Sequence, residues 1–109
     1  MDTFRFDLPH DLEEAVRAGK KTIDVRVNIQ PFADVKKGDI ISYHHTEVRV
    51  SHIRAYPGLG DLVAYEDHAR IIPWAKDKNE ALQSLMEEML ERKPAHGVLA
   101  IEFEPPTQN

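Results

Sequence analysis

The chain contains no cysteine among its 109 residues, which excludes disulfide bonds and metal sites built on thiolates. No apolar run approaches the ~20 residues that a membrane-spanning helix needs. Residues 1–5 lack the basic and then apolar pattern of a secretory signal peptide. We therefore expect a cytoplasmic protein that does not associate with membranes.

Positive charge is also scarce. The 14 lysines and arginines are outnumbered by 19 acidic residues, for a formal net charge of −5. General attraction to a phosphate backbone is therefore not expected, and nucleic-acid binding would require a local basic patch or a pocket for a single nucleotide. Hydrophobic residues make up 41% of the chain, enough for a folded core. With no repeat, linker or low-complexity segment, we expect one domain over residues 1–109.

The hydrophobic pattern predicts short strands joined mostly by turns. Five strands are expected, at residues 4–8, 22–29, 40–43, 47–54 and 97–103. Helices are expected after Pro9, after Asp61 and from Asp77 to Leu90. The last of these helices would bury Ala81, Leu82, Leu85, Met86, Met89 and Leu90. Because no strand–helix–strand rhythm is present, a doubly wound sheet is excluded, and an α+β fold with a small mixed or closed barrel and flanking helices is favoured.

The first helix carries signals at both ends. Asp11 is a candidate N-cap, and Glu14 three residues later completes a possible capping box. Gly19 is placed to end the helix in a left-handed turn.

A polar strand face follows that turn. Ile23 and Val25 would point one way, and Thr22, Asp24 and Arg26 the other, with Lys21 at the strand entrance. These side chains could recognise a small polar ligand. Alternatively, they form a solvated strand face with an ion pair between Asp24 and Arg26.

These residues carry a family resemblance. The run 19–22 after a helix, with Asp24 and Arg26 following, resembles the signature of the ASCH domain family. Further matches occur in the same order at residues 37–41, Tyr56, residues 72–73 and residues 97–101. The resemblance extends from about Phe4 to Phe103. It implies a PUA-like β-barrel of about six strands, with a cleft between barrel and helices that binds RNA or a nucleotide-like ligand and requires no cofactor.

One branch of the ASCH family comprises amidohydrolases that remove the acetyl group from N4-acetylcytidine. Their lysine falls on Lys21, whereas their threonine falls on Asp24. Their glutamate falls close to Ile72, where this chain has no acid, although Glu66 or Asp67 would match under another loop alignment.

The candidate residues allow both binding and catalysis. As catalytic groups, Lys21 would be a base if burial lowered its pKa, Thr22 a nucleophile, and Asp24 an activator of water. As binding groups, Asp24 would accept from an exocyclic amine, while Lys21 and Arg26 would hold a phosphate or a base carbonyl.

A tyrosine, a tryptophan and two histidines are further candidates for the site. Trp74 could stack on a base and Tyr56 could face the cleft, or both could simply pack in the fold. His44 and His45 are adjacent, so on a strand they would face opposite sides, and no metal site is expected.

Two function classes remain open. The first is a binding module for RNA or a nucleoside-like ligand; the second is a hydrolase acting on N4-acylated cytidine nucleosides or on RNA, the latter as a ribonuclease. A tight ion pair between Lys21 and Asp24 would suit binding, whereas a neutral Lys21 beside a free hydroxyl would suit catalysis.

Overall fold

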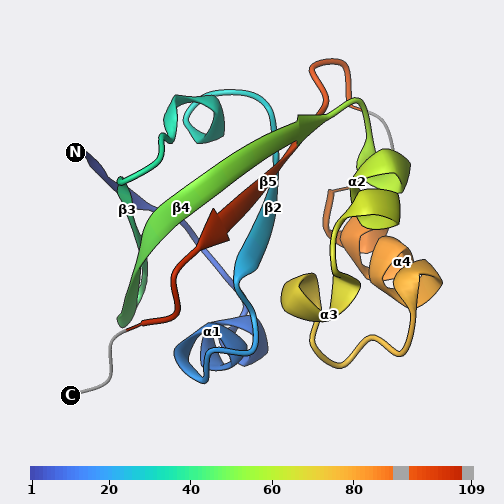
Figure 1. The fold of residues 1–109 in the computed structure, drawn as a ribbon, viewed down its shortest axis with the longest axis horizontal. Helices are drawn as coiled ribbons and strands as arrows, with labels where there is room; N and C mark the ends of the chain where they lie inside the picture. The colour runs from blue at the N-terminus through green and yellow to red at the C-terminus, as the bar shows by residue number, and fades with distance from the viewer. Residues whose placement is uncertain (90–93, 107–109) are drawn as a thin grey trace.

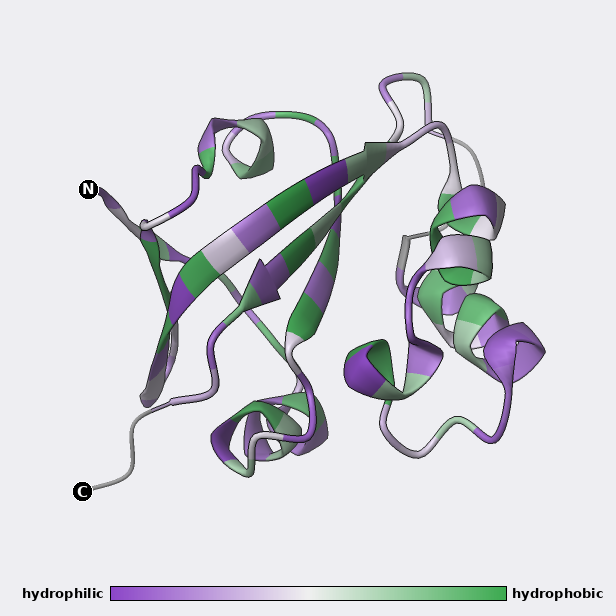
Figure 2. Ribbon diagram, viewed as in Figure 1, coloured by the Kyte–Doolittle hydropathy of each residue, from purple (hydrophilic) through white to green (hydrophobic). Residues whose placement is uncertain are grey.

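Strict alternation of apolar and polar residues builds the centre of the sheet. β4 (Thr46–Tyr56) and β5 (Val98–Phe103) pair antiparallel in the computed structural model, which describes residues 1–89 and 94–106. Figure 2 shows the alternation as successive hydrophilic and hydrophobic bands along β4. β4 was predicted from this alternation and β5 from its run of apolar residues, and both predictions are confirmed.

The remaining strands extend this pair on both sides. β1 (Thr3–Arg5), β2 (Ile23–Val27) and β3 (Ile40–Tyr43) complete a sheet with the order β1-β3-β4-β5-β2. Only β1 and β3 pair in parallel. The sheet curls into half of a barrel, with β1 and β2 at its edges (Figure 1). The described residues thus form an α+β, barrel-like fold, with five strands where the resemblance implies about six.

Helices cover the open sides of this sheet (Figure 1). They are α1 (His10–Arg17), the 3₁₀ turn η1 (Phe32–Asp34), α2 (Leu59–Tyr65), α3 (His68–Ile71) and α4 (Lys78–Met89). The long helix was expected to pack directly on the barrel. Instead α4 packs mainly on α2 and α3, and α2 contacts β4 and β5. Of the residues predicted to be buried on α4, Ala81 and Leu85 are buried and Leu82 is partly buried, whereas Met86 is exposed, contrary to the prediction. Met89 and Leu90 lie outside the described side chains.

The ends of α1 differ from the sequence prediction in one respect. Its N-cap residue is Pro9 and not Asp11, whose carboxylate accepts from the amide of Leu12. The Glu14 side chain bonds Arg17 within the helix and forms no capping box. Gly19, with φ of +76°, makes the expected left-handed turn.

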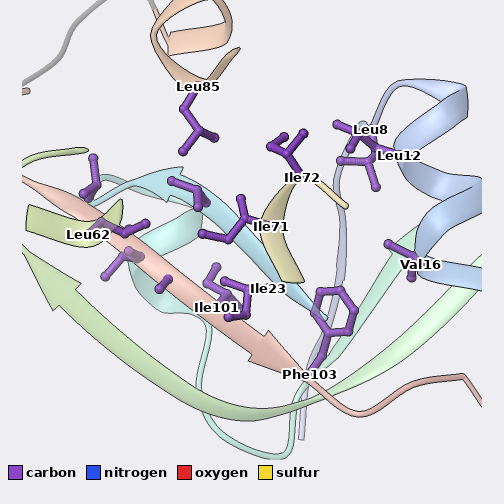
Figure 3. Close-up of a cluster of buried hydrophobic side chains, with 14 of the residues drawn as sticks. Leu8, Leu12, Val16, Ile23, Leu62, Ile71, Ile72, Leu85, Ile101 and Phe103 are labelled. Atoms are coloured by element: carbon purple, nitrogen blue, oxygen red, sulfur yellow. The ribbon is translucent and has the colours of Figure 1, made fainter. Parts of the chain in front are cut away.

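The core lies between the curled sheet and the helices. Figure 3 shows Ile23, Ile101 and Phe103 of the sheet facing Val16 of α1 and Ile71 of α3. All five of these side chains are buried. In the described part of the chain, no helix has the length and apolar character needed to cross a membrane.

Candidate functional site

A cleft of about 600 Å³ opens beside the edge strand β2. One wall is β2 with the segment that leads into α1, and the opposite wall is α4 with the loop after α3. Its apolar lining comes from Leu8, Leu12, Ile72 and Leu85, which Figure 3 shows on three separate parts of the fold. The polar lining includes Lys21, Asp24, Arg26 and Trp74. The structure therefore brings four of the six predicted site residues to one cleft.

Lys21 is buried, although its position at a strand entrance suggested an exposed side chain. The turn at Gly19 folds the chain back, and the amides of Lys20 and Lys21 both donate to the carbonyl of Ala15. This reversal carries the Lys21 side chain under α3, where only 2% of the residue is exposed. Its Nζ donates to the carbonyl oxygens of Ile23 at 2.6 Å and Ile71 at 2.7 Å.

Burial changes the protonation of Lys21. Loss of solvent lowers its pKa to about 8, although the negative charge of Asp24 acts in the opposite direction. No ion pair within 4 Å joins Lys21 to Asp24 in the described residues. A substantial fraction of Lys21 is therefore neutral at pH 8.

Asp24 is held by two donors from different strands. The Tyr43 hydroxyl of β3 donates to its Oδ2 at 2.6 Å, and Arg26 Nε donates to the same oxygen at 3.0 Å. Asp24 is only 3% exposed. Its other oxygen, Oδ1, has no hydrogen-bond partner within the described residues. Among those residues, every polar side-chain atom that is fully enclosed does have a hydrogen-bond partner. Oδ1 therefore retains some solvent contact, and Asp24 is one of the residues that line the cleft.

Arg26 is fixed over aromatic rings. Its guanidinium carbon lies 5.3 Å from the ring centres of both Phe6 and Phe32. Nη2 also donates to the carbonyl of Asp7 at 2.6 Å. The neighbouring charge of Asp24 offsets the effect of burial and raises the pKa of Arg26. Asp24 and Arg26 thus form the ion pair that was one of the alternatives expected from the sequence, but in a cleft wall and not on an open surface.

Trp74 stands at the cleft with its side chain largely accessible, at 53% exposure. It follows α3 in an irregular segment. An indole placed in this way offers a flat surface for stacking.

Thr22 does not share the cleft with Asp24, contrary to the sequence prediction. Regular strand geometry begins one residue later, at Ile23. The Thr22 hydroxyl accepts from Arg70 Nε at 2.7 Å, and Thr22 is not among the lining residues. An oxygen already bonded to a guanidinium and turned away from the cleft is a poor nucleophile for a ligand there.

Tyr56 also lies outside the cleft lining. Its hydroxyl donates to Glu66, which accepts two further bonds from Arg54 at 2.7 and 2.8 Å. Arg54 also pairs with Glu102 at 2.9 Å. These groups link β4, β5 and the end of α2, so Glu66 serves the fold and does not supply the missing acid of the cleft.

Four acidic lining residues were missed by sequence reasoning as site residues. They are Asp7, Asp11, Glu87 and Glu88. Glu87 and Glu88 are exposed on α4, as expected for the polar face of a helix. The pattern on α4 cannot reveal that this face looks across a cleft towards β2, because that depends on how α4 packs against α2 and α3. The described residues hold no group of three side chains suited to a metal ion.

The chain is similar to two solved structures over nearly its whole length. The crystal structure of hypothetical protein PH0355 matches with a TM-score of 0.86 and 30% identity, covering 96% of this chain and 99% of that one. The chain belongs to the same family as PH0355. The solution structure of protein PF0455 from Pyrococcus furiosus matches with a TM-score of 0.78 and 29% identity, covering 94% of this chain and 96% of that one.

These matches establish a shared fold across the elements that form the cleft. PH0355 is described only as a hypothetical protein, so the likeness brings no activity with it. No protein-family model matches the chain, and no curated protein matches it. The function must therefore be argued from the cleft itself.

Proposed function

We propose that this chain is an ASCH domain with a PUA-like barrel, and that its cleft binds a nucleoside-like ligand. The observation that carries the proposal is the convergence of Lys21, Asp24, Arg26 and Trp74 on one cleft of about 600 Å³. That volume lies within the usual range for small-molecule sites.

The cleft supplies the contacts that a base requires. Trp74 offers a stacking surface. Asp24 Oδ1 can accept from an exocyclic amine, and Lys21 can donate a third proton to a base carbonyl because the carbonyls of Ile23 and Ile71 use only two. The apolar side chains of Leu8, Leu12, Ile72 and Leu85 complete the walls.

Calorimetric titration with the four common ribonucleosides tests the proposal. We expect saturable binding of at least one of them by the wild type. Lys21→Met should weaken it by about tenfold, because a hydrogen bond from a charged donor contributes about 1.5 kcal/mol. Lys20→Met is the matched control, since Lys20 is exposed and adjacent in sequence. Equal effects of the two substitutions would refute the site, as would an absence of binding to any nucleoside.

One observation favours a second candidate, an amidohydrolase acting on N4-acylated cytidine. Lys21 has a pKa of about 8 and no ion pair with Asp24 within 4 Å in the described residues. A partly neutral lysine in a cleft can serve as a general base. It would take a proton from water as the water adds to the acyl carbonyl carbon. The bond between that carbon and N4 would then break as the protonated lysine returns the proton to N4, which gives cytidine and the carboxylic acid.

Incubation with N4-acetylcytidine separates the two candidates. If the chain is a hydrolase, the wild type should release cytidine, Lys21→Met should not, and Asp24→Thr should retain or raise turnover because it restores the residue of the amidohydrolase branch. Binding without release of cytidine supports the binding module and rejects the hydrolase.

A further inference from the structure

The cleft has a marked charge imbalance. Its lining contains five carboxylates and two cationic side chains, an excess of three negative charges. The carboxylates are those of Asp7, Asp11, Asp24, Glu87 and Glu88. They come from both walls, so a bound ligand would be surrounded by negative charge.

The two cations do little to balance this charge for a ligand. Lys21 donates two of its protons to the carbonyls of Ile23 and Ile71. Arg26 donates to Asp24 and to the carbonyl of Asp7, and its guanidinium lies over two aromatic rings. Lys21 keeps one free donor, and Arg26 is held in place by its bonds to Asp24 and Asp7, so the two side chains do not form an open cationic cradle like those that bind phosphate.

The second observation is the half-satisfied carboxylate of Asp24. Oδ2 accepts from Tyr43 and Arg26, whereas Oδ1 has no partner in the described residues, and Asp24 lines the cleft. The residue is 97% buried, since its exposure is 3%. A carboxylate oxygen in such a site attracts a positively charged donor more strongly than a neutral one, because water screens the interaction poorly there.

Trp74 also favours a positively charged ligand. An indole face is the best of the protein aromatic rings for binding a cation, and this one is 53% exposed at the cleft. Glu88 of α4 also favours a cationic ligand. Its negative charge acts across the cleft, as its effects on Lys21 and Arg26 indicate.

We propose that the cleft selects nucleosides whose base carries a positive charge and rejects those that carry a 5′-phosphate. Such bases arise by alkylation of a ring nitrogen. The charged ring would stack on Trp74 while its N–H edge donates to Asp24 Oδ1, and the acidic rim would repel a phosphate. This inference rests on the proposed function and narrows it to one ligand class.

Calorimetric titration at pH 7 with matched pairs tests the inference. The probes are 3-methylcytidine beside cytidine and 1-methyladenosine beside adenosine, because the methylated bases are cationic at neutral pH. We expect the cationic member of at least one pair to bind about tenfold more tightly, as expected for a partly desolvated cation–π and carboxylate contact. The 5′-monophosphate of the same cationic nucleoside should bind at least about tenfold more weakly.

Two variants test whether Asp24 and Glu88 cause the preference for a cationic base. Asp24→Asn should weaken binding of the cationic base by a larger factor than binding of its neutral partner, and so remove most of the preference. Glu88→Gln should reduce the preference without risk to the fold, because Glu88 is exposed. Asp61→Asn is the control, since Asp61 is an exposed acid on α2 that does not line the cleft.

The outcomes separate this inference from the proposal on which it rests. If neutral and cationic nucleosides bind equally well at the cleft, the charge inference is overturned and the nucleoside site stands. If the 5′-monophosphate binds as tightly as its nucleoside, rejection of phosphate is overturned. If no nucleoside of either kind binds, the proposed function itself fails.

Discussion

At the scale of single residues, the site depends on a lysine and a carboxylate that are both buried but do not pair. Sequence alternation placed Lys21, Asp24 and Arg26 near one another, and the structure brings them to the same cleft. The sequence pattern could not show that the Lys21 side chain lies under α3, because its acceptor, the carbonyl of Ile71, is 50 residues away in sequence. For the same reason it could not show that Thr22 is bonded to Arg70.

The lowered pKa of Lys21 predicts how stability varies with pH. The folded-state pKa is about 8 and the ordinary value is 10.5. Between these values the unfolded chain binds more protons, so this residue makes stability rise with pH, by at most about 1.4 kcal/mol per pH unit. Urea unfolding of wild type and Lys21→Met from pH 7 to 10.5 should show the wild type gaining stability relative to the variant.

Lys20→Met is the control for that series, because exposed Lys20 should leave the pH dependence of the wild type unchanged. Parallel curves for wild type and Lys21→Met would show that Lys21 is not desolvated in the folded protein.

Tyr43 provides a second test at this scale. Its side chain is fully buried, and its hydroxyl donates to Asp24 at 2.6 Å. Tyr43→Phe removes a donor from a buried carboxylate, and we expect a loss of about 2 kcal/mol in the free energy of unfolding. Tyr65→Phe is the matched control because Tyr65 is 79% exposed. Equal stabilities of the two variants would argue against the Tyr43–Asp24 bond.

At the scale of helices and strands, periodic segments were predicted well and short irregular ones were not. Residues 47–54 alternate strictly, and they form most of β4. Residues 69–74 have no hydrophobic period and predict neither helix nor strand, yet α3 includes the first three of them, with Asp67 as its N-cap. A helix of four residues carries too few positions for a pattern to show.

The turn before β5, which lies beside the end of β4, gives a prediction about stability. Gly97 precedes β5 with φ of +78°, and a Cβ added there would lie 2.5 Å from the carbonyl oxygen of Tyr56. Gly97→Ala therefore combines a left-handed backbone with a backbone clash, and we expect a loss of about 3 kcal/mol.

Gly19→Ala isolates the conformational part of this cost. Gly19 has nearly the same φ, +76°, but an added Cβ would meet only Pro105 at 3.7 Å, an ordinary contact. We expect a loss of about 1 kcal/mol. Thermal unfolding of both variants measures the difference, and equal losses would contradict the clash at Tyr56.

At the scale of the whole molecule, charge separates this protein from general RNA binders. The net charge is −5, and the cleft itself is acidic. We expect weak binding to single-stranded RNA of random sequence, with affinity that falls steeply as salt increases. A mobility-shift titration at physiological salt tests this expectation, and tight binding there would contradict it.

The sequence predicted the α+β class and the half of the cleft that lies on one continuous segment, residues 21–26. The other half required three-dimensional packing. Glu88 lies on α4, which reaches the cleft through contacts with α2 and α3 and not through the sheet. A helix pattern identifies the buried face of α4 but not the element that its exposed face opposes.

The contact between Lys21 and the carbonyl of Ile23 also bears on self-association. β2 is an edge strand, and edge strands offer backbone groups to which another chain can add a strand. The buried Lys21 ammonium group lies against this carbonyl, so the amide of an incoming chain could bond it only beside that group or by displacing it. Lys21, which lines the cleft, therefore also hinders the pairing of the β2 edge with a strand of a second molecule.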